Sequence, residues 1–345
     1  MNTRCWIVVP ALTVALVAVM TLAPASVAGQ QQSAAKAWTP PRTVDGQPDL
    51  QGTWTNATIT PLERPRELGD KQFFTEQEAA EYEKQVLEKF DRDRRDGGAE
   101  ADLARAYGSI WWDGGRKSLV VPSRRTSLIV DPPDGRVPPL TAQAQARMNA
   151  ARAETRLHPY DGPENRPPAE RCLLWPTTGP PMLPSFYRNA PYGPLVTNYV
   201  IVQTSGYVVI FAEINHDARI IPLDGRPHSS PGIRQWLGDS RGHWEGDTLV
   251  VETTNFTDKT NFQGADEKMR LIERFTRTGP GAIVYRFTVD DPTAFTRPWT
   301  AEIPYTASAD PIIDFACNEG NYGLAGMLSG ARADEKAAAD AAAKR

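Results

Sequence analysis

Residues 198–305 form an almost unbroken series of short apolar segments separated by tight turns. The segments are rich in β-branched residues, and the turns contain pairs such as Ser205-Gly206 and Asp224-Gly225. The pattern predicts eight strands, over residues 199–204, 207–213, 218–223, 242–245, 248–254, 269–276, 282–289 and 298–305. Eight sequential antiparallel strands are enough to close a barrel without a free edge. We therefore predict a mainly β protein with an eight-stranded antiparallel barrel over residues 198–320.

The N-terminal end of the chain has the pattern of a secretory signal. Arg4 precedes an apolar run over residues 6–20, and small residues at 26–28 suit cleavage before Gly29. Residues 1–28 are therefore predicted to be a signal peptide, and the protein is expected to be periplasmic or secreted. No later segment approaches 18 consecutive apolar residues, so we expect no membrane span.

The two cysteines beyond this signal, Cys172 and Cys317, are expected to form one disulfide, because export leads to an oxidising compartment. Closing a loop of about 145 residues would stabilise the fold by up to roughly 5 kcal/mol in the chain-entropy description. Two buried free thiols, or one reactive thiol, are the alternative.

Residues 29–197 are predicted to form an irregular N-terminal arm that wraps on the barrel. A capping box at residues 75–78 begins the first of two expected helices. The arm is expected to contain helices over residues 75–93 and 141–155 and strands over residues 118–121 and 126–130. Residues 159–194 are dense in proline and glycine and are expected to lie against the barrel in an extended conformation. Residues 321–345 are predicted to be a C-terminal helical tail.

Charge and motifs limit the function classes. The net charge is −4 and both signs are scattered along the chain, so the sequence lacks the basic patches of nucleic-acid-binding proteins. Phosphate-binding glycine loops and Cys-x-x-Cys pairs are missing, which argues against nucleotide-dependent enzymes. We therefore predict no cofactor and no nucleic-acid partner, and we expect a small-molecule ligand or substrate.

Several long motifs resemble a largely uncharacterised family of secreted bacterial proteins. They lie at residues 48–54, 131–136, 216–228, 238–254, 297–302 and 317–322. The first motif contains Gly52-Thr-Trp54, which resembles the Gly-x-Trp entry of lipocalin-type barrels, where a tryptophan plugs one end. The family resemblance implies no activity. The looser lipocalin (calycin-type) similarity implies an internal cavity for a small, largely apolar ligand.

The densest group of polar side chains lies at two consecutive turns of the predicted barrel. A histidine beside a carboxylate acts as a general base near neutral pH, and nearby arginines bind carboxylates or stabilise oxyanions. We therefore predict Arg226 as a substrate-binding residue and a catalytic group at the barrel mouth made of Glu213, His216, Asp217, Arg219 and His228. The alternative is structural, because Asp and Arg beside turns commonly cap backbone groups and pair with each other.

Three of the four histidines, His216, His228 and His243, lie within 28 residues of each other. With Glu213 or Glu245 they would supply the ligands of a divalent metal site. Their spacing matches no compact metal motif, so a bound metal is an alternative to the cofactor-free prediction.

Strand periodicity places several carboxylates among apolar neighbours. Glu273 shares a strand face with Leu271 and Phe275, and two of Glu252, Glu273 and Glu302 would suffice as an acid–base pair. We favour an outward polar face instead, because arginines 270, 274 and 286 balance these charges. Tryptophans 236, 244 and 299 are candidates for stacking on a ligand, although such residues are more often core. The predicted substrate-binding residues from this region are Trp244, Glu252, Arg286, Trp299 and Glu302.

Two functions follow from these patterns. The first is an exported, cofactor-independent acid–base enzyme, a lyase, isomerase or hydrolase, acting on a small, partly apolar or glycosidic molecule. His216 would act there with Glu213 or Asp217. The alternative is a non-catalytic, lipocalin-like periplasmic protein that binds a small apolar or aromatic ligand.

Overall fold

A computed structural model describes residues 38–89, 97–100, 124–175, 177–184, 198–260, 262–315 and 317–344. The predicted signal peptide and the predicted strand over residues 118–121 lie outside the described residues. Before the barrel region, the chain forms β1 (Gly52–Thr55), α1 (Glu76–Lys89), β2 (Ile129–Asp131) and α4 (Ala142–Leu157). After it, the chain ends in α5 (Tyr322–Ala343). No helix among these residues is both long and apolar enough to cross a membrane.

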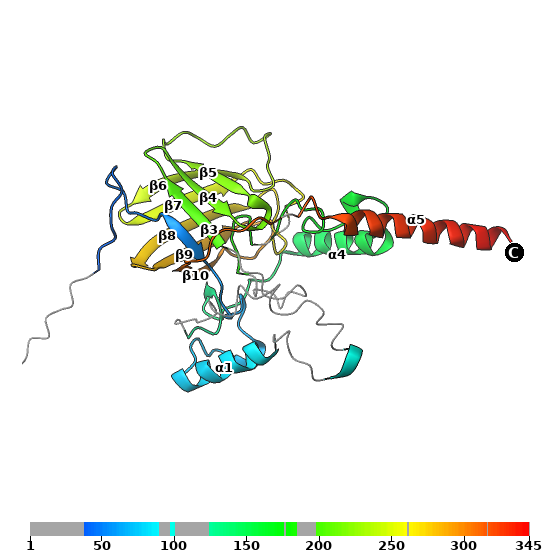
Figure 1. Ribbon diagram of the computed structural model, residues 1–345, viewed down its shortest axis with the longest axis horizontal. Helices are drawn as coiled ribbons and strands as arrows, with labels where there is room; N and C mark the ends of the chain where they lie inside the picture. The colour runs from blue at the N-terminus through cyan, green and yellow to red at the C-terminus, as the bar shows by residue number, and fades with distance from the viewer. Residues whose placement is uncertain are drawn as a thin grey trace, which may run out of the picture. The chain divides into compact units, whose positions relative to one another are not determined.

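The centre of the protein is an antiparallel sheet curved into a nearly closed barrel (Figure 1). Eight of its strands come from the predicted region: β3 (Asn198–Gln203), β4 (Tyr207–Ala212), β5 (Ala218–Pro222), β6 (Asp239–Glu245), β7 (Thr248–Thr254), β8 (Arg270–Gly279), β9 (Ala282–Asp290) and β10 (Trp299–Ala307). The strand order is β5-β4-β3-β1-β10-β9-β8-β7-β6, and β2 pairs with β10 outside this path. The mainly β barrel is confirmed, with two more strands than the eight predicted.

The added strand β1 joins the two ends of the predicted series. It pairs with β3 on one side and β10 on the other, with Trp54 opposite Tyr199 and Ala307. Trp54 is buried, and its indole Nε1 donates to the carbonyl of Leu50 at 2.9 Å. The Gly-x-Trp segment therefore forms a barrel strand whose tryptophan belongs to the core.

The remaining opening of the barrel lies between β5 and β6, the two ends of the strand order. Side chains rather than a backbone ladder close this seam. A Cβ on Gly242 would lie 2.8 Å from both Ile221 and Leu223, so only glycine lets these apolar side chains pack across the seam.

The barrel interior is filled by the protein itself. Its inward-facing positions carry fully buried aromatic side chains, among them Tyr285, which stacks on Phe275 at 4.8 Å between ring centroids. Met182 and Leu183 of the arm are buried in the same core. The backbone N–H of Met182 donates to the Tyr285 hydroxyl at 3.2 Å, so the arm reaches the inner wall of the barrel.

The arm is fixed to the rest of the chain at several places. Cys172 and Cys317 form the predicted disulfide, with their Cα atoms 5.8 Å apart. The Thr141 side chain caps α4 by accepting from Ala144 N at 3.1 Å, and it donates to the Thr293 carbonyl at 2.7 Å. The start of α4 is therefore attached to the loop between β9 and β10, and the arm near Cys172 is attached to the segment that follows β10.

Candidate functional site

Arg219, predicted at a catalytic rim, faces the barrel interior from β5. Its guanidinium donates to Glu273 Oε1 at 2.9 Å and forms a second bond with Oε2, which makes the pair bidentate. It also donates to Ser240 Oγ at 2.9 Å and Thr253 Oγ1 at 2.7 Å. The Tyr285 hydroxyl donates to Glu273 Oε1 at 2.7 Å. This buried network joins β5, at one edge of the seam, to β6, β7, β8 and β9.

The electrostatics of this network keep the Arg219 guanidinium charged and the Tyr285 hydroxyl protonated. Burial acts to lower the pKa of Arg219, but the Glu273 carboxylate outweighs it and holds that pKa above its ordinary value. Burial, reinforced by Glu273, raises the pKa of the Tyr285 hydroxyl well above its ordinary value, so Tyr285 stays a donor. Every charged atom has a partner, which is the condition under which a buried ion pair is tolerated. Arg219 therefore has a structural role: it connects β5 to β6 and β8 across the opening of the barrel.

Glu213 and His216 lie at the turn between β4 and β5, where they hold the segment that follows β10. Glu213 is buried, and its Oε1 accepts from Ile313 N at 3.1 Å. His216 Nε2 lies 3.0 Å from the backbone nitrogen of Phe315 and 3.3 Å from the carbonyl oxygen of Ile313. The imidazole stacks on Phe211 at 5.9 Å. Both groups are therefore engaged with the protein's own backbone.

Asp217, next to this turn, is half-buried, and burial raises the pKa of its carboxyl against an opposing hydrogen bond from Thr178. Its Oδ2 has no hydrogen-bond partner among the described residues. The structure thus brings Glu213, His216 and Asp217 to one turn. It places Arg219 inside the barrel and His228 in a different cluster.

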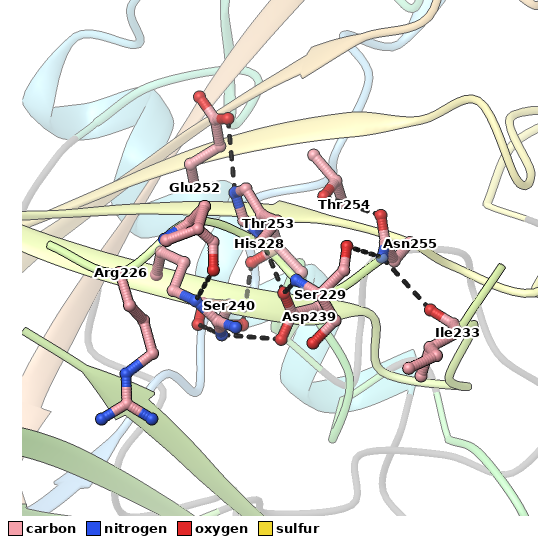
Figure 2. Close-up of polar contacts among 12 residues, drawn as sticks. Arg226, His228, Ser229, Ile233, Asp239, Ser240, Glu252, Thr253, Thr254 and Asn255 are labelled. Carbon is pink, nitrogen blue, oxygen red and sulfur yellow. Dashed lines mark hydrogen bonds and ion pairs between the residues drawn. The ribbon is translucent and has the colours of Figure 1, made fainter. Parts of the chain in front are cut away.

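His228 lies between two carboxylates (Figure 2). Its Nδ1 is 3.0 Å from Asp239 Oδ2, and its Nε2 is 3.4 Å from Glu252 Oε1. Asp239 also accepts from the backbone N–H of Ser229 at 2.9 Å and from Arg241 Nη1 at 2.6 Å. Burial acts to raise the pKa of Asp239, but these donors together hold it below its ordinary value. The result is an imidazole oriented by an ionised, nearly buried carboxylate.

The loop that carries His228 is anchored by Asn255. The Asn255 side chain donates to the carbonyl oxygens of Ser229, Ser230 and Ile233 at 3.0, 3.1 and 3.2 Å. The backbone of Asn255 has a positive φ of 58°, a conformation that Asn tolerates better than most residues. His228 is therefore held on a well-fixed loop, with 24% of its side chain exposed.

Residues 238–242 match the Gly-x-Ser-x-Gly pattern of serine hydrolases. In the structure this segment enters and follows strand β6 rather than forming a strand-to-helix turn. Successive side chains point to opposite faces of a strand, so Ser240 faces the interior while Asp239 and His228 lie outside. The Ser240 hydroxyl accepts from Arg219, and the arrangement is not a catalytic triad.

The other predicted binding residues lie apart from each other. Glu252 and Glu302 are on the outer surface in ion pairs with Arg270 and Arg286, as the balanced-charge interpretation expected. For Glu273 the same interpretation is wrong, because its side chain is buried inside the barrel against Arg219. Arg226 pairs with Asp224 in the next turn, Trp244 is a partly buried residue packed on the core, and Trp299 is fully buried.

The structure does not bring His216, His228 and His243 together. The His243 side chain is exposed, and its Nε2 lies 3.1 Å from Glu245 Oε1. Throughout the part of the chain that the structure describes, no group of three or more His, Cys, Asp or Glu side chains could hold a metal ion.

A large hollow lies outside the barrel. It is a half-open cleft of about 660 Å³ between α4, the arm (residues 167–169, 174–175 and 179–181) and the two ends of the β6–β7 hairpin. Aromatic side chains line it: Trp175 from the arm, Trp236 before β6 and Phe262 after β7. Phe262 stacks on the buried Trp299 at 5.9 Å, so the cleft wall continues into the barrel core. We call this hollow the cleft.

The cleft also gathers positive charge. Arg152 and Arg156 of α4 and Lys259 after β7 belong to its lining, and none of the lining residues that the structure describes is Asp or Glu. Of these lining residues, sequence reasoning named only Trp236. Inside the barrel, Glu273 was indicated in the sequence only by the strand face that it shares with Leu271 and Phe275. The cleft combines α4 and residues 167–181 with the segments before β6 and after β7, which lie much further along the chain, so no local pattern could have indicated it.

We predict that Glu273→Gln lowers the free energy of unfolding by about 3–5 kcal/mol, because it leaves the buried Arg219 charge without a counterion. Glu302→Gln, which removes a surface carboxylate from the Arg286 pair, should cost no more than about 1 kcal/mol. Urea unfolding measures both. The double variant Arg219→Met/Glu273→Leu should recover part of the loss. Equal losses for Glu273→Gln and Glu302→Gln would contradict the assigned role.

We predict that Asp239 contributes a pH-dependent part of the stability. Its folded pKa lies below the ordinary value of 3.8, so its contribution is complete above that pH and is lost as the pH falls through the folded pKa. Asp239→Asn should therefore be less stable than wild type near neutral pH, and the difference should shrink in strong acid. Urea midpoints across an acidic pH series test this; a difference that stays constant with pH would refute it.

Comparison with known proteins does not assign this chain to a family. No protein-family model matches it, and no curated protein matches it. The resemblance of its motifs to a family of secreted bacterial proteins therefore stays a prediction. The function has to be argued from the cleft and from the His228 cluster.

Proposed function

We propose that the protein acts outside the cytoplasm and binds a small, partly aromatic molecule in the cleft. The observation that carries the proposal is the cleft itself, whose volume of about 660 Å³ is in the range of small-molecule sites. Its three aromatic side chains offer flat apolar surfaces on which a ring stacks favourably. The disulfide supports the extracytoplasmic location, because such bonds persist in oxidising compartments.

The cleft is a better candidate than the barrel interior, where lipocalin-type proteins hold a ligand. The interior positions are occupied by buried aromatic residues, by the Arg219–Glu273 pair and by Met182 and Leu183 of the arm. A ligand inside the barrel would have to displace these groups and break a satisfied ion pair. The cleft requires no such displacement.

The walls of the cleft are held in place by contacts of their own. Arg147 of α4 donates to the Gly264 carbonyl at 3.2 Å and forms an ion pair with Asp266 at 3.0 Å. The Thr260 hydroxyl donates to the Trp236 carbonyl at 2.9 Å, which joins the two ends of the β6–β7 hairpin. A site with fixed walls loses less conformational entropy when a ligand binds.

We predict that Trp236→Ala weakens the binding of a naphthalene-ring probe by about tenfold, because the variant loses one stacking surface, worth about 1.4 kcal/mol. Isothermal titration calorimetry with 2-naphthoate and 2-naphthamide measures the affinities. Trp38→Ala, which removes an exposed tryptophan outside the cleft lining, is the matched control and should bind as wild type does. Absence of binding by both probes, or equal binding by wild type and Trp236→Ala, would overturn the proposal.

A second candidate function, an acid–base enzyme, is favoured by the His228 cluster rather than by the predicted His216 turn. Asp239 fixes the imidazole through Nδ1 and leaves Nε2 toward Glu252, on a partly exposed loop. A histidine oriented in this way is suited to remove a proton from water or from a substrate hydroxyl. Glu213 and His216 are less suited, because both already accept backbone hydrogen bonds.

If His228 is a general base, His228→Gln should reduce the hydrolysis of 4-nitrophenyl acetate by about 100-fold or to the uncatalysed rate. His243→Gln removes an exposed histidine that also lies beside a glutamate, and it should keep the wild-type rate. Initial rates followed by the release of 4-nitrophenolate decide the matter. Equal rates for the two variants would dismiss catalysis by His228.

A further inference from the structure

We infer that the molecule bound in the cleft is an anion, an aromatic ring system that carries a carboxylate. The inference rests on the proposed binding function and names the ligand class for the same site. It comes from the charged side chains among the described lining residues, which are all positive.

The cations of the cleft lack the counterions that several arginines of the barrel surface have. On the barrel surface, Arg270, Arg286 and Arg226 each form an ion pair with a carboxylate. Within the part of the chain that the structure describes, Arg152, Arg156 and Lys259 have neither an ion pair nor a side-chain hydrogen bond. Three positive charges without an ion-pair partner therefore line one hollow, whose described lining residues include no Asp or Glu.

The positions of these cations concentrate the charge. Arg152 and Arg156 are four residues apart on α4, so they share one face of the helix, where like charges repel each other. Lys259 joins the lining from a different segment, after β7. An anion between them would relieve the repulsion and would accept charge-assisted hydrogen bonds, which are stronger than those between neutral groups. A carboxylate matches the planar fork of an arginine side chain.

The rest of the lining defines the remainder of the ligand. Trp175, Trp236 and Phe262 are aromatic, and Pro180 and Pro181 add apolar surface from the arm. A small hydrophilic anion would leave these surfaces in contact with water, whereas an aromatic carboxylate uses both the apolar walls and the cations. The lining therefore favours a ligand with both parts.

Two probes of nearly equal shape test the charge: 2-naphthoate, which is an anion at neutral pH, and 2-naphthamide, which is neutral. Titration calorimetry on the full disulfide-bonded protein should show that 2-naphthoate binds at least about tenfold more tightly. Added salt should weaken the binding of 2-naphthoate more than that of 2-naphthamide, because salt screens exposed charges. Arg152→Gln/Arg156→Gln should lose most of the preference for the anion and retain the binding of 2-naphthamide.

The matched control is Lys84→Gln/Lys336→Gln, which changes the net charge by the same amount at exposed positions of α1 and α5 outside the cleft lining. It should keep the wild-type preference for 2-naphthoate. Equal affinities of the wild type for the two probes would overturn the inference and leave the binding function standing. A preference lost equally in both double variants would overturn it as well, because the effect would then come from net charge. Failure of both probes to bind would overturn the proposed function and the inference together.

Discussion

The bidentate ion pair between Arg219 and Glu273 is the interaction on which the barrel depends. The end strands β5 and β6 do not pair with each other in the strand order, and Arg219 reaches from β5 to Ser240 on β6 and to Glu273 on β8. A buried charge is costly unless it is fully paired. Here the hydroxyl groups of Ser240 and Thr253 accept from Arg219, and the Tyr285 hydroxyl donates to Glu273. Side chains therefore close the seam where a backbone ladder is missing.

This way of closing the barrel decides where a ligand can bind. The interior holds the ion pair and its hydroxyl partners, and the arm adds Met182 and Leu183 from one side. The barrel therefore serves as a rigid support. The same arm that fills the interior also lines the cleft with Pro180 and Pro181, immediately before those core residues. The proposed binding site therefore lies on the outer side of the barrel.

The sequence allowed the barrel to be predicted because strand periodicity is local, and the eight strands between residues 198 and 305 confirm it. The closing strand β1 is only four residues long and pairs with partners far along the chain, so periodicity could not place it. Glu273 was recognisable by the apolar face it shares with Leu271 and Phe275. That pattern alone could not show that the face points inward or that Arg219 would meet it there.

The predicted rim cluster shows why proximity in sequence was a poor guide to the site. Glu213 and His216 have partners at Ile313 and Phe315, about 100 residues away, and these partners use the lone pairs that catalysis would need. His228 lies only a few residues further along, yet its environment is two carboxylates and a fixed loop. Residue type had suggested one site. Hydrogen-bond partners instead divide the cluster into an anchor for the C-terminal segment, a buried ion pair and an imidazole oriented between two carboxylates.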